Sequence, residues 1–130
     1  MSTLPRLALE FAQRTLEATG QHLDFSLRSL ALLDDLLDEW LHLAQVYGSE
    51  RPHDLSEFTL PLLAYVGETI RQAFGGSWIE RSGAPVLRLT DTTELDLAPY
   101  VRAVLSSQQP PAFARLVHAL ERALEDRGGG

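Results

Sequence analysis

Cysteine and lysine are both absent from these 130 residues. Without cysteine, the chain has no disulfide, no thiolate metal ligand and no thiol nucleophile. Without lysine, it has no amine for a Schiff base and no P-loop lysine, and all 11 of its basic residues are arginines. These two absences exclude several common enzyme classes.

Long hydrophobic runs are also missing. No apolar segment approaches the roughly 18 to 20 residues that a membrane-spanning helix needs. The first segment, Met1 to Glu10, carries one arginine and no long apolar core, which is unlike a signal peptide. We therefore expect a cytoplasmic protein with no membrane partner.

The chain has fewer basic residues (11) than acidic residues (18), and its net charge is −7. A chain with no basic run is a poor candidate for binding nucleic acid, because neutralisation of phosphates dominates that affinity. The hydrophobic content of 45% is that of an ordinary folded core. We expect a single domain spanning residues 1–130, which would bury about two-thirds of its unfolded surface.

Two helices are predicted in the first half of the chain. The first runs over Leu4–Thr19, with Thr3 as its N-cap. Its apolar side contains Leu7, Phe11 and Ala18. After it, residues 22–25 are either an edge strand or an extended connector.

Ser26 is the predicted N-cap of the second helix, Leu27–Tyr47, in which apolar residues recur at steps of three and four. The apolar face contains Leu30, Leu33, Leu37, Trp40, Ala44 and Tyr47, with Leu32, Leu36 and Leu43 at its margin. Such a wide face implies contact with more than one neighbour, because a coiled-coil seam would be narrower. The opposite, polar half contains Asp34, Asp35, Asp38, Glu39, His42 and Gln45.

A third helix is predicted from about Thr59 to Phe74, and Gly75 and Gly76 end it. Its buried side contains Leu62, Val66, Thr69, Ile70 and Ala73. Gly67 lies at the edge of that side, where a missing side chain allows another element to approach closely.

After Gly76 the hydrophobic period changes from 3.6 to 2. Ser77–Arg81 and Val86–Thr90 read as two strands joined by a turn over residues 82–85, and Glu94–Asp96 adds a third strand. A lone hairpin is marginal in water, so this meander must pack on helices.

Two further helices complete the predicted fold. One runs over Ala98–Leu105 with Asp96 as its cap, and the last begins at Pro110 and Pro111. The fold class is therefore α+β, with about five helices packed on a three-stranded antiparallel meander of residues 77–96.

The acidic segment of the second helix is a weak candidate metal site. Asp34, Asp38 and His42 follow one another at intervals of four residues, so that one helix face could present them to an ion. A solvated helix face explains the same pattern, and the sequence offers no further ligands. We expect no bound metal and no cofactor.

A second candidate site joins the third helix to the hairpin. Tyr65, Glu68 and Arg71 lie on the helix, and Trp78 and Arg88 lie on the strands. If the two elements fold together, these side chains could line one cleft, where arginine beside an aromatic ring suits a carboxylate, a phosphate or a partner's side chain. The alternative is that Trp78 belongs to the core and that the charged residues form structural ion pairs.

Three segments together resemble small bacterial domains of unknown function that pair a leucine-rich helix with a GGxW hairpin. They are LDFSLRSLALLDDLLDEW, AYVGETIRQAFGGSWIE and PVLRLTDTTELDLAPYVRAVL, within residues 23–105. The resemblance implies an α+β architecture and transfers no catalytic residues to this chain.

Two functions remain open. The leading hypothesis is a non-enzymatic protein-interaction or regulatory domain, which acts on a protein partner or in a homo-oligomer. An outer acidic patch on the second helix, formed by Asp35, Glu39 and His42, could then contribute to binding. The alternative is a small-molecule- or metal-binding enzyme that uses the helix–hairpin cleft.

Overall fold

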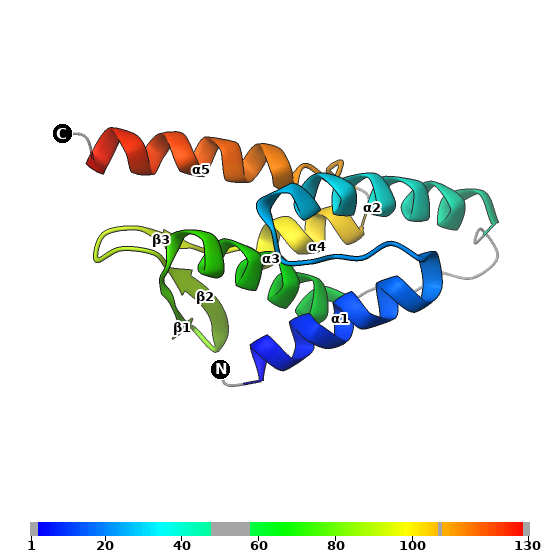
Figure 1. Cartoon of the computed structure of the whole chain (residues 1–130), viewed down its shortest axis with the longest axis horizontal. Coiled ribbons are helices and arrows are strands. Elements are labelled where there is room, and N and C mark those ends of the chain that lie inside the picture. The colour runs from blue at the N-terminus through cyan, green and yellow to red at the C-terminus, as the bar shows by residue number, and fades with distance from the viewer. Residues whose placement is uncertain (1–2, 48–57, 107, 129–130) are drawn as a thin grey trace.

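The computed structural model describes residues 3–47, 58–106 and 108–128. Figure 1 shows helices gathered around one central helix, with a small sheet at one end. The elements in chain order are α1 (Leu4–Thr19), α2 (Leu27–Tyr47), α3 (Thr59–Phe74), β1 (Ser77–Arg81), β2 (Ala84–Arg88), β3 (Glu94–Leu95), α4 (Ala98–Leu105) and α5 (Phe113–Gly128). The predicted α+β class, with five helices and a three-stranded antiparallel meander, is confirmed over the described ranges.

The centre of the fold is α3. All nine residues from Leu62 to Ile70 are buried, whereas a surface helix buries only one side. Helix α1 packs along α3, and α2 and α4 contact it elsewhere. The predicted buried face was too narrow, because it left out Glu68, and it wrongly included Ala73, which is exposed.

Helix α1 has the predicted bounds, but its buried side is different. The residues that contact the core are Leu4, Ala8 and Ala12, at intervals of four. Two alanines in this row let α1 approach α3 closely. Phe11 from the predicted apolar side is only half-buried, and Ala18 is exposed. Thr3 occupies the predicted N-cap position, but its side chain makes no capping hydrogen bond in the described structure.

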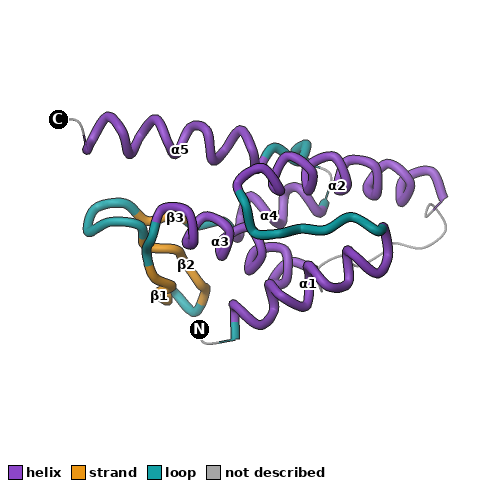
Figure 2. The backbone as a smooth tube through the Cα atoms, viewed as in Figure 1, coloured by secondary structure: helices purple, strands orange, loops and turns teal. Residues whose placement is uncertain are grey.

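Residues 21–24 form an extended connector rather than a strand, and the connector runs back between α1 and α2 (Figure 2). Leu23 anchors it in the core. Phe25 has a φ of 64°, which is unusual for a bulky residue, and its ring stacks on Tyr65 with centroids 4.7 Å apart. Ser26 then caps α2 as predicted, because its Oγ accepts a hydrogen bond from the N–H of Ser29 at 3.1 Å.

The sheet has the order β1-β2-β3, and both pairs are antiparallel. The β1–β2 turn consists of Ser82 and Gly83, whose φ angles of 54° and 80° fit a two-residue hairpin turn. The predicted turn over residues 82–85 was too long, because β2 begins at Ala84. Pro85 lacks an N–H and is usual in loops. It lies instead within β2, opposite Glu80, beyond the part of β2 that pairs with the short β3.

Helices α4 and α5 complete the core. The N-cap position of α4 is Leu97, which makes no side-chain capping bond in the described structure, so the predicted cap at Asp96 was wrong. Helix α5 begins at Phe113, slightly later than predicted, and packs against α2 (Figure 1). Tyr100 of α4 holds the segment before α5, since its hydroxyl accepts a hydrogen bond from the N–H of Ala112 at 2.9 Å.

None of the helices in the described ranges is long and apolar enough to cross a membrane.

Candidate functional site

A buried carboxylate joins α3 to the hairpin. Glu68 is only 2% exposed, and both of its oxygens accept hydrogen bonds. Oε2 accepts from Nε of Arg71 at 2.6 Å and from the indole Nε1 of Trp78 at 2.8 Å, while Oε1 accepts from Nη2 of Arg71 at 3.0 Å. The bidentate geometry is that of a strong arginine–carboxylate pair. We call these three residues the Glu68 cluster.

Gly67 makes the Glu68 cluster possible. A Cβ atom built at this position would lie 2.1 Å from Cη2 of Trp78, so the indole ring occupies the space that any other residue would fill. Gly75, with a φ of 83°, then ends α3 and leads the chain into β1, which carries Trp78 back onto the helix. The predicted close approach at Gly67 is confirmed.

Opposing effects set the pKa of Glu68. Burial alone would raise it, but the hydrogen bonds from Arg71 and Trp78 and the positive charge of Arg71 outweigh burial and lower the pKa. Glu68 is therefore ionised at neutral pH. A general acid or base needs the opposite shift, toward neutrality.

Tyr65 faces the start of α2. Its hydroxyl lies 2.7 Å from Oγ of Ser29 and accepts a hydrogen bond from the N–H of Phe25 at 3.0 Å. The side chain is fully buried, and burial raises the pKa of its phenol despite these hydrogen bonds. Tyr65 thus positions the connector between α1 and α2.

Arg88 does not join the Glu68 cluster. Residues directly opposite each other in an antiparallel pair share a face, and neighbours along a strand alternate. Trp78 lies opposite Leu87, whereas Arg88 lies opposite Ser77 and Glu94. Trp78 and Arg88 are therefore on opposite faces of the sheet, so these two residues do not line together the single cleft that the sequence left open as one possibility. Their participation in binding stays a prediction.

The surroundings of Arg88 leave part of its guanidinium unsatisfied. Nη2 donates a long hydrogen bond of 3.4 Å to the carbonyl of Asp91, and the buried Nε has no acceptor among the described residues. The neighbouring Glu94 pairs instead with Arg81, at 3.0 Å between Nε and Oε1.

The acidic residues of α2 serve different purposes. We predicted that Asp34 is solvated, but it is half-buried. Its oxygens accept hydrogen bonds from the N–H groups of Phe113 at 2.8 Å and Ala114 at 3.0 Å. Ala112, at the N-cap position of α5, has no side chain that could cap, so Asp34 caps α5 from another helix. Burial raises the pKa of Asp34 although both N–H bonds lower it.

Asp38 and His42, the other two weak metal candidates, are exposed. No group of three or more potential ligands for a metal ion occurs in the described part of the chain. Because Asp34 is engaged with α5, it is not available to complete a site with its neighbours.

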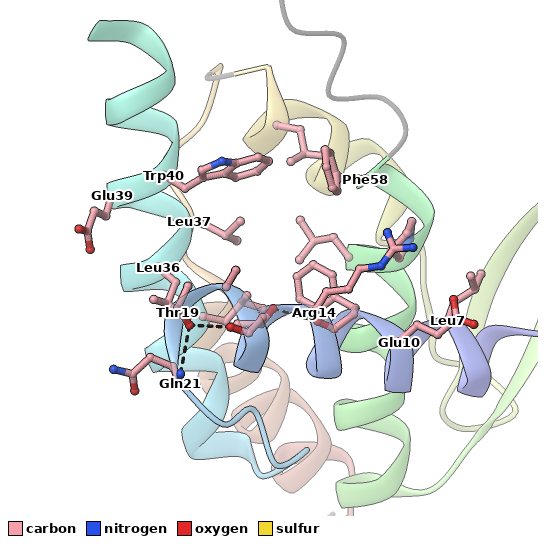
Figure 3. Close-up of a pocket in the computed structure, with 17 residues that line it drawn as sticks. Leu7, Glu10, Arg14, Thr19, Gln21, Leu36, Leu37, Glu39, Trp40 and Phe58 are labelled. Atoms are coloured by element: carbon pink, nitrogen blue, oxygen red, sulfur yellow. Dashed lines mark hydrogen bonds between the residues drawn. The ribbon is translucent and has the colours of Figure 1, made fainter. Parts of the chain in front are cut away.

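An apolar pocket that we did not predict lies between α1, α2 and α3, with a volume of about 730 Å³ (Figure 3). The sequence signal was the wide apolar face of α2, on which Leu36 and Trp40 extend beyond the stripe that the core buries. Trp40 remains 38% exposed, and its ring makes an edge contact with Phe58 at a centroid distance of 5.3 Å.

No protein-family model, curated protein or solved structure matches this chain.

Proposed function

We propose that this protein is a non-enzymatic interaction domain. The observation that carries the proposal is the state of Glu68. Its oxygens are occupied by Arg71 and Trp78, and its pKa is shifted away from the range that acid–base catalysis uses. The chemistry of the Glu68 cluster is thus directed inward, where it fastens the hairpin to α3.

The outer acidic patch of α2 supports a protein partner with a basic surface. Asp35, Glu39 and His42 are exposed, and the two carboxylates make no ion pair within the described ranges. With a net charge of −7, the molecule would attract a positively charged partner at long range. Self-association through another face is the competing form of this proposal, and sedimentation at several protein concentrations tests it.

A random-peptide display library selected on the immobilised protein tests the basic partner. We expect the enriched peptides to contain more lysine and arginine than the starting library. They should lose binding to the double variant Asp35→Lys/Glu39→Lys. The matched control is Glu121→Lys/Glu125→Lys, which makes the same charge change at the same spacing on α5 and should retain binding. Absence of enrichment, or equal loss in both variants, would contradict the proposal.

One observation favours the small-molecule form of the alternative, an enzyme that binds an anionic ligand at the hairpin. The buried Nε of Arg88 has no acceptor in the described structure, and an anion could supply one. Thermal-shift measurements with inorganic phosphate and with acetate test this alternative. A stabilisation that Arg88→Ala abolishes would support it, whereas no stabilisation by either anion would remove its basis.

A further inference from the structure

The pocket between α1, α2 and α3 has the size and composition of a small-molecule site. Its volume of about 730 Å³ falls within the range of roughly 300–1,000 Å³ that such sites occupy. Helix α1 packs on α3, and α2 contacts α3 at only a few residues, so the space between α1 and α2 stays open. Leu105 of α4 also lines the pocket.

The lining is mainly apolar. Aromatic rings come from three elements, with Phe11 on α1, Trp40 on α2 and Phe58 just before α3. Leu37 and Leu62 also line the pocket. Binding of an apolar ligand to such a surface is favourable, because it removes apolar area of both from water. The body of the ligand is therefore hydrocarbon or aromatic.

Among the described residues, Arg14 is the one basic residue that lines this apolar space, and it is exposed to solvent. Figure 3 shows Arg14 reaching from α1 toward the side of the pocket that Phe58 occupies, whereas Glu39 points away from it. Glu10 pairs with Arg6 at 3.5 Å on the surface of α1. Arg14 makes no ion pair or hydrogen bond with any other described side chain. A guanidinium in this setting is suited to pair with a carboxylate.

The geometry points to a binding site for an apolar carboxylate, with its hydrocarbon body among Trp40, Phe58 and Leu37 and its head group paired with Arg14. This site is separate from the Glu68 cluster and from the outer acidic patch. Its ligand is a small molecule, so the site goes beyond the proposed interaction function and does not depend on it.

Calorimetric titration of the full chain with decanoate, below its micellar concentration, tests the site. We expect saturable binding of one decanoate per chain and much weaker binding of decyltrimethylammonium, which has the same body and the opposite charge. Arg14→Gln should weaken decanoate binding by about three- to tenfold, the range for a partly exposed charged pair, and leave the binding of 1-decanol unchanged. The matched control is Arg28→Gln, which changes an exposed arginine of α2 that does not line the pocket.

A second pair of variants tests the location. Ala18 lines the pocket and is exposed, so Ala18→Trp should obstruct the opening without disturbing the core, and decanoate binding should be lost. Ala31→Trp places the same ring on an exposed position of α2 outside the pocket and should bind normally. Circular dichroism would verify that both variants fold. The inference is overturned if decanoate does not bind, if the cationic analogue binds equally well, or if Ala18→Trp has no effect.

Discussion

Gly67 and Trp78 determine how the hairpin meets α3. The helix approaches the indole ring so closely that no side chain fits between them, and Glu68 holds the indole N–H in that position. A glycine inside a helix costs about 1 kcal/mol relative to alanine. Here that cost is offset by ring packing and by a buried hydrogen bond.

Gly67→Ala should destabilise the protein although alanine is the better helix former. The new methyl would force the ring of Trp78 to move, and overpacking of this kind costs about 1–3 kcal/mol, which exceeds the gain in helix propensity. We expect a net loss of up to about 2 kcal/mol in urea unfolding. The same substitution in a Trp78→Phe background should cost less, because the smaller ring leaves space. Equal costs in the two backgrounds would show that ring and glycine are not coupled.

Glu68 should make stability depend on pH. Its folded pKa lies below the ordinary value of 4.5, so its ionised form stabilises the fold at neutral pH. This contribution is fully present above that value and is lost as the pH falls through the lower, folded pKa. Glu68→Gln should therefore cost about 1–3 kcal/mol at neutral pH, which is less than the roughly 3–5 kcal/mol for a fully buried pair, because Arg71 stays in contact with solvent.

Urea unfolding of both proteins at about pH 7 and about pH 3 measures this dependence. The difference in unfolding free energy between wild type and Glu68→Gln should shrink in acid, as the pH falls below 4.5 toward the lower pKa of Glu68 in the folded protein. A difference that stays constant with pH would mean that the carboxylate charge contributes nothing.

At the scale of elements, α5 depends on a cap from a distant helix. Its N-terminal N–H groups are bonded by Asp34 of α2, and Tyr100 of α4 fixes the residues just before it. Phe113, Val117 and Leu120 supply the buried side of the helix. Orientation of α5 is thus set at its first turn.

Asp34→Ala should destabilise the protein by about 1–2 kcal/mol, the usual cost of removing a helix cap. Hydrogen exchange should become faster at the first amides of α5. Asp35→Ala is the matched control, because this neighbour is exposed, and its effect should stay within about 0.5 kcal/mol. Equal effects of the two substitutions would mean that Asp34 is not a cap.

The helix bounds, apart from the start of α5, and the bounds of β1 could be predicted closely from the sequence, whereas the length of the hairpin turn and the bounds of β2 could not. Local signals define helices, such as Ser26 before α2 and Gly75 after α3. In the hairpin, Pro85 is typical of a turn because it lacks an N–H. The strand pairing around Pro85, however, does not require an N–H at that position. The argument from the chemistry of proline was sound, but the sequence does not reveal the strand register that accommodates Pro85 in β2.

At the scale of the whole molecule, the sequence placed Glu68 on the polar side of α3 because it lies opposite the strongest apolar stripe. Helical period alone cannot reveal that another element covers the second side. The same limit hid the capping by Asp34, whose partners lie 79 and 80 residues away in the chain. The pocket, too, depends on how α1 and α2 diverge, which no single helix encodes.

Because α3 is enclosed, its amides should be the most protected in the protein. Native-state hydrogen exchange should be slowest for residues 62–70, whose opening requires the core to come apart. The last turns of α5 should exchange much faster. Comparable protection in α3 and in those last turns would contradict a core organised around α3.

The two tryptophans lie in opposite kinds of surroundings, and this gives the protein two separate optical reporters. Trp40 is partly open to solvent at the pocket, so dissolved quenchers such as acrylamide should reach it readily. Trp78 is held against Gly67 with its N–H bonded to a carboxylate, so its emission should respond only when the hairpin leaves α3. Fluorescence can therefore distinguish an event at the α1–α2 opening from separation of the sheet in the unmodified chain.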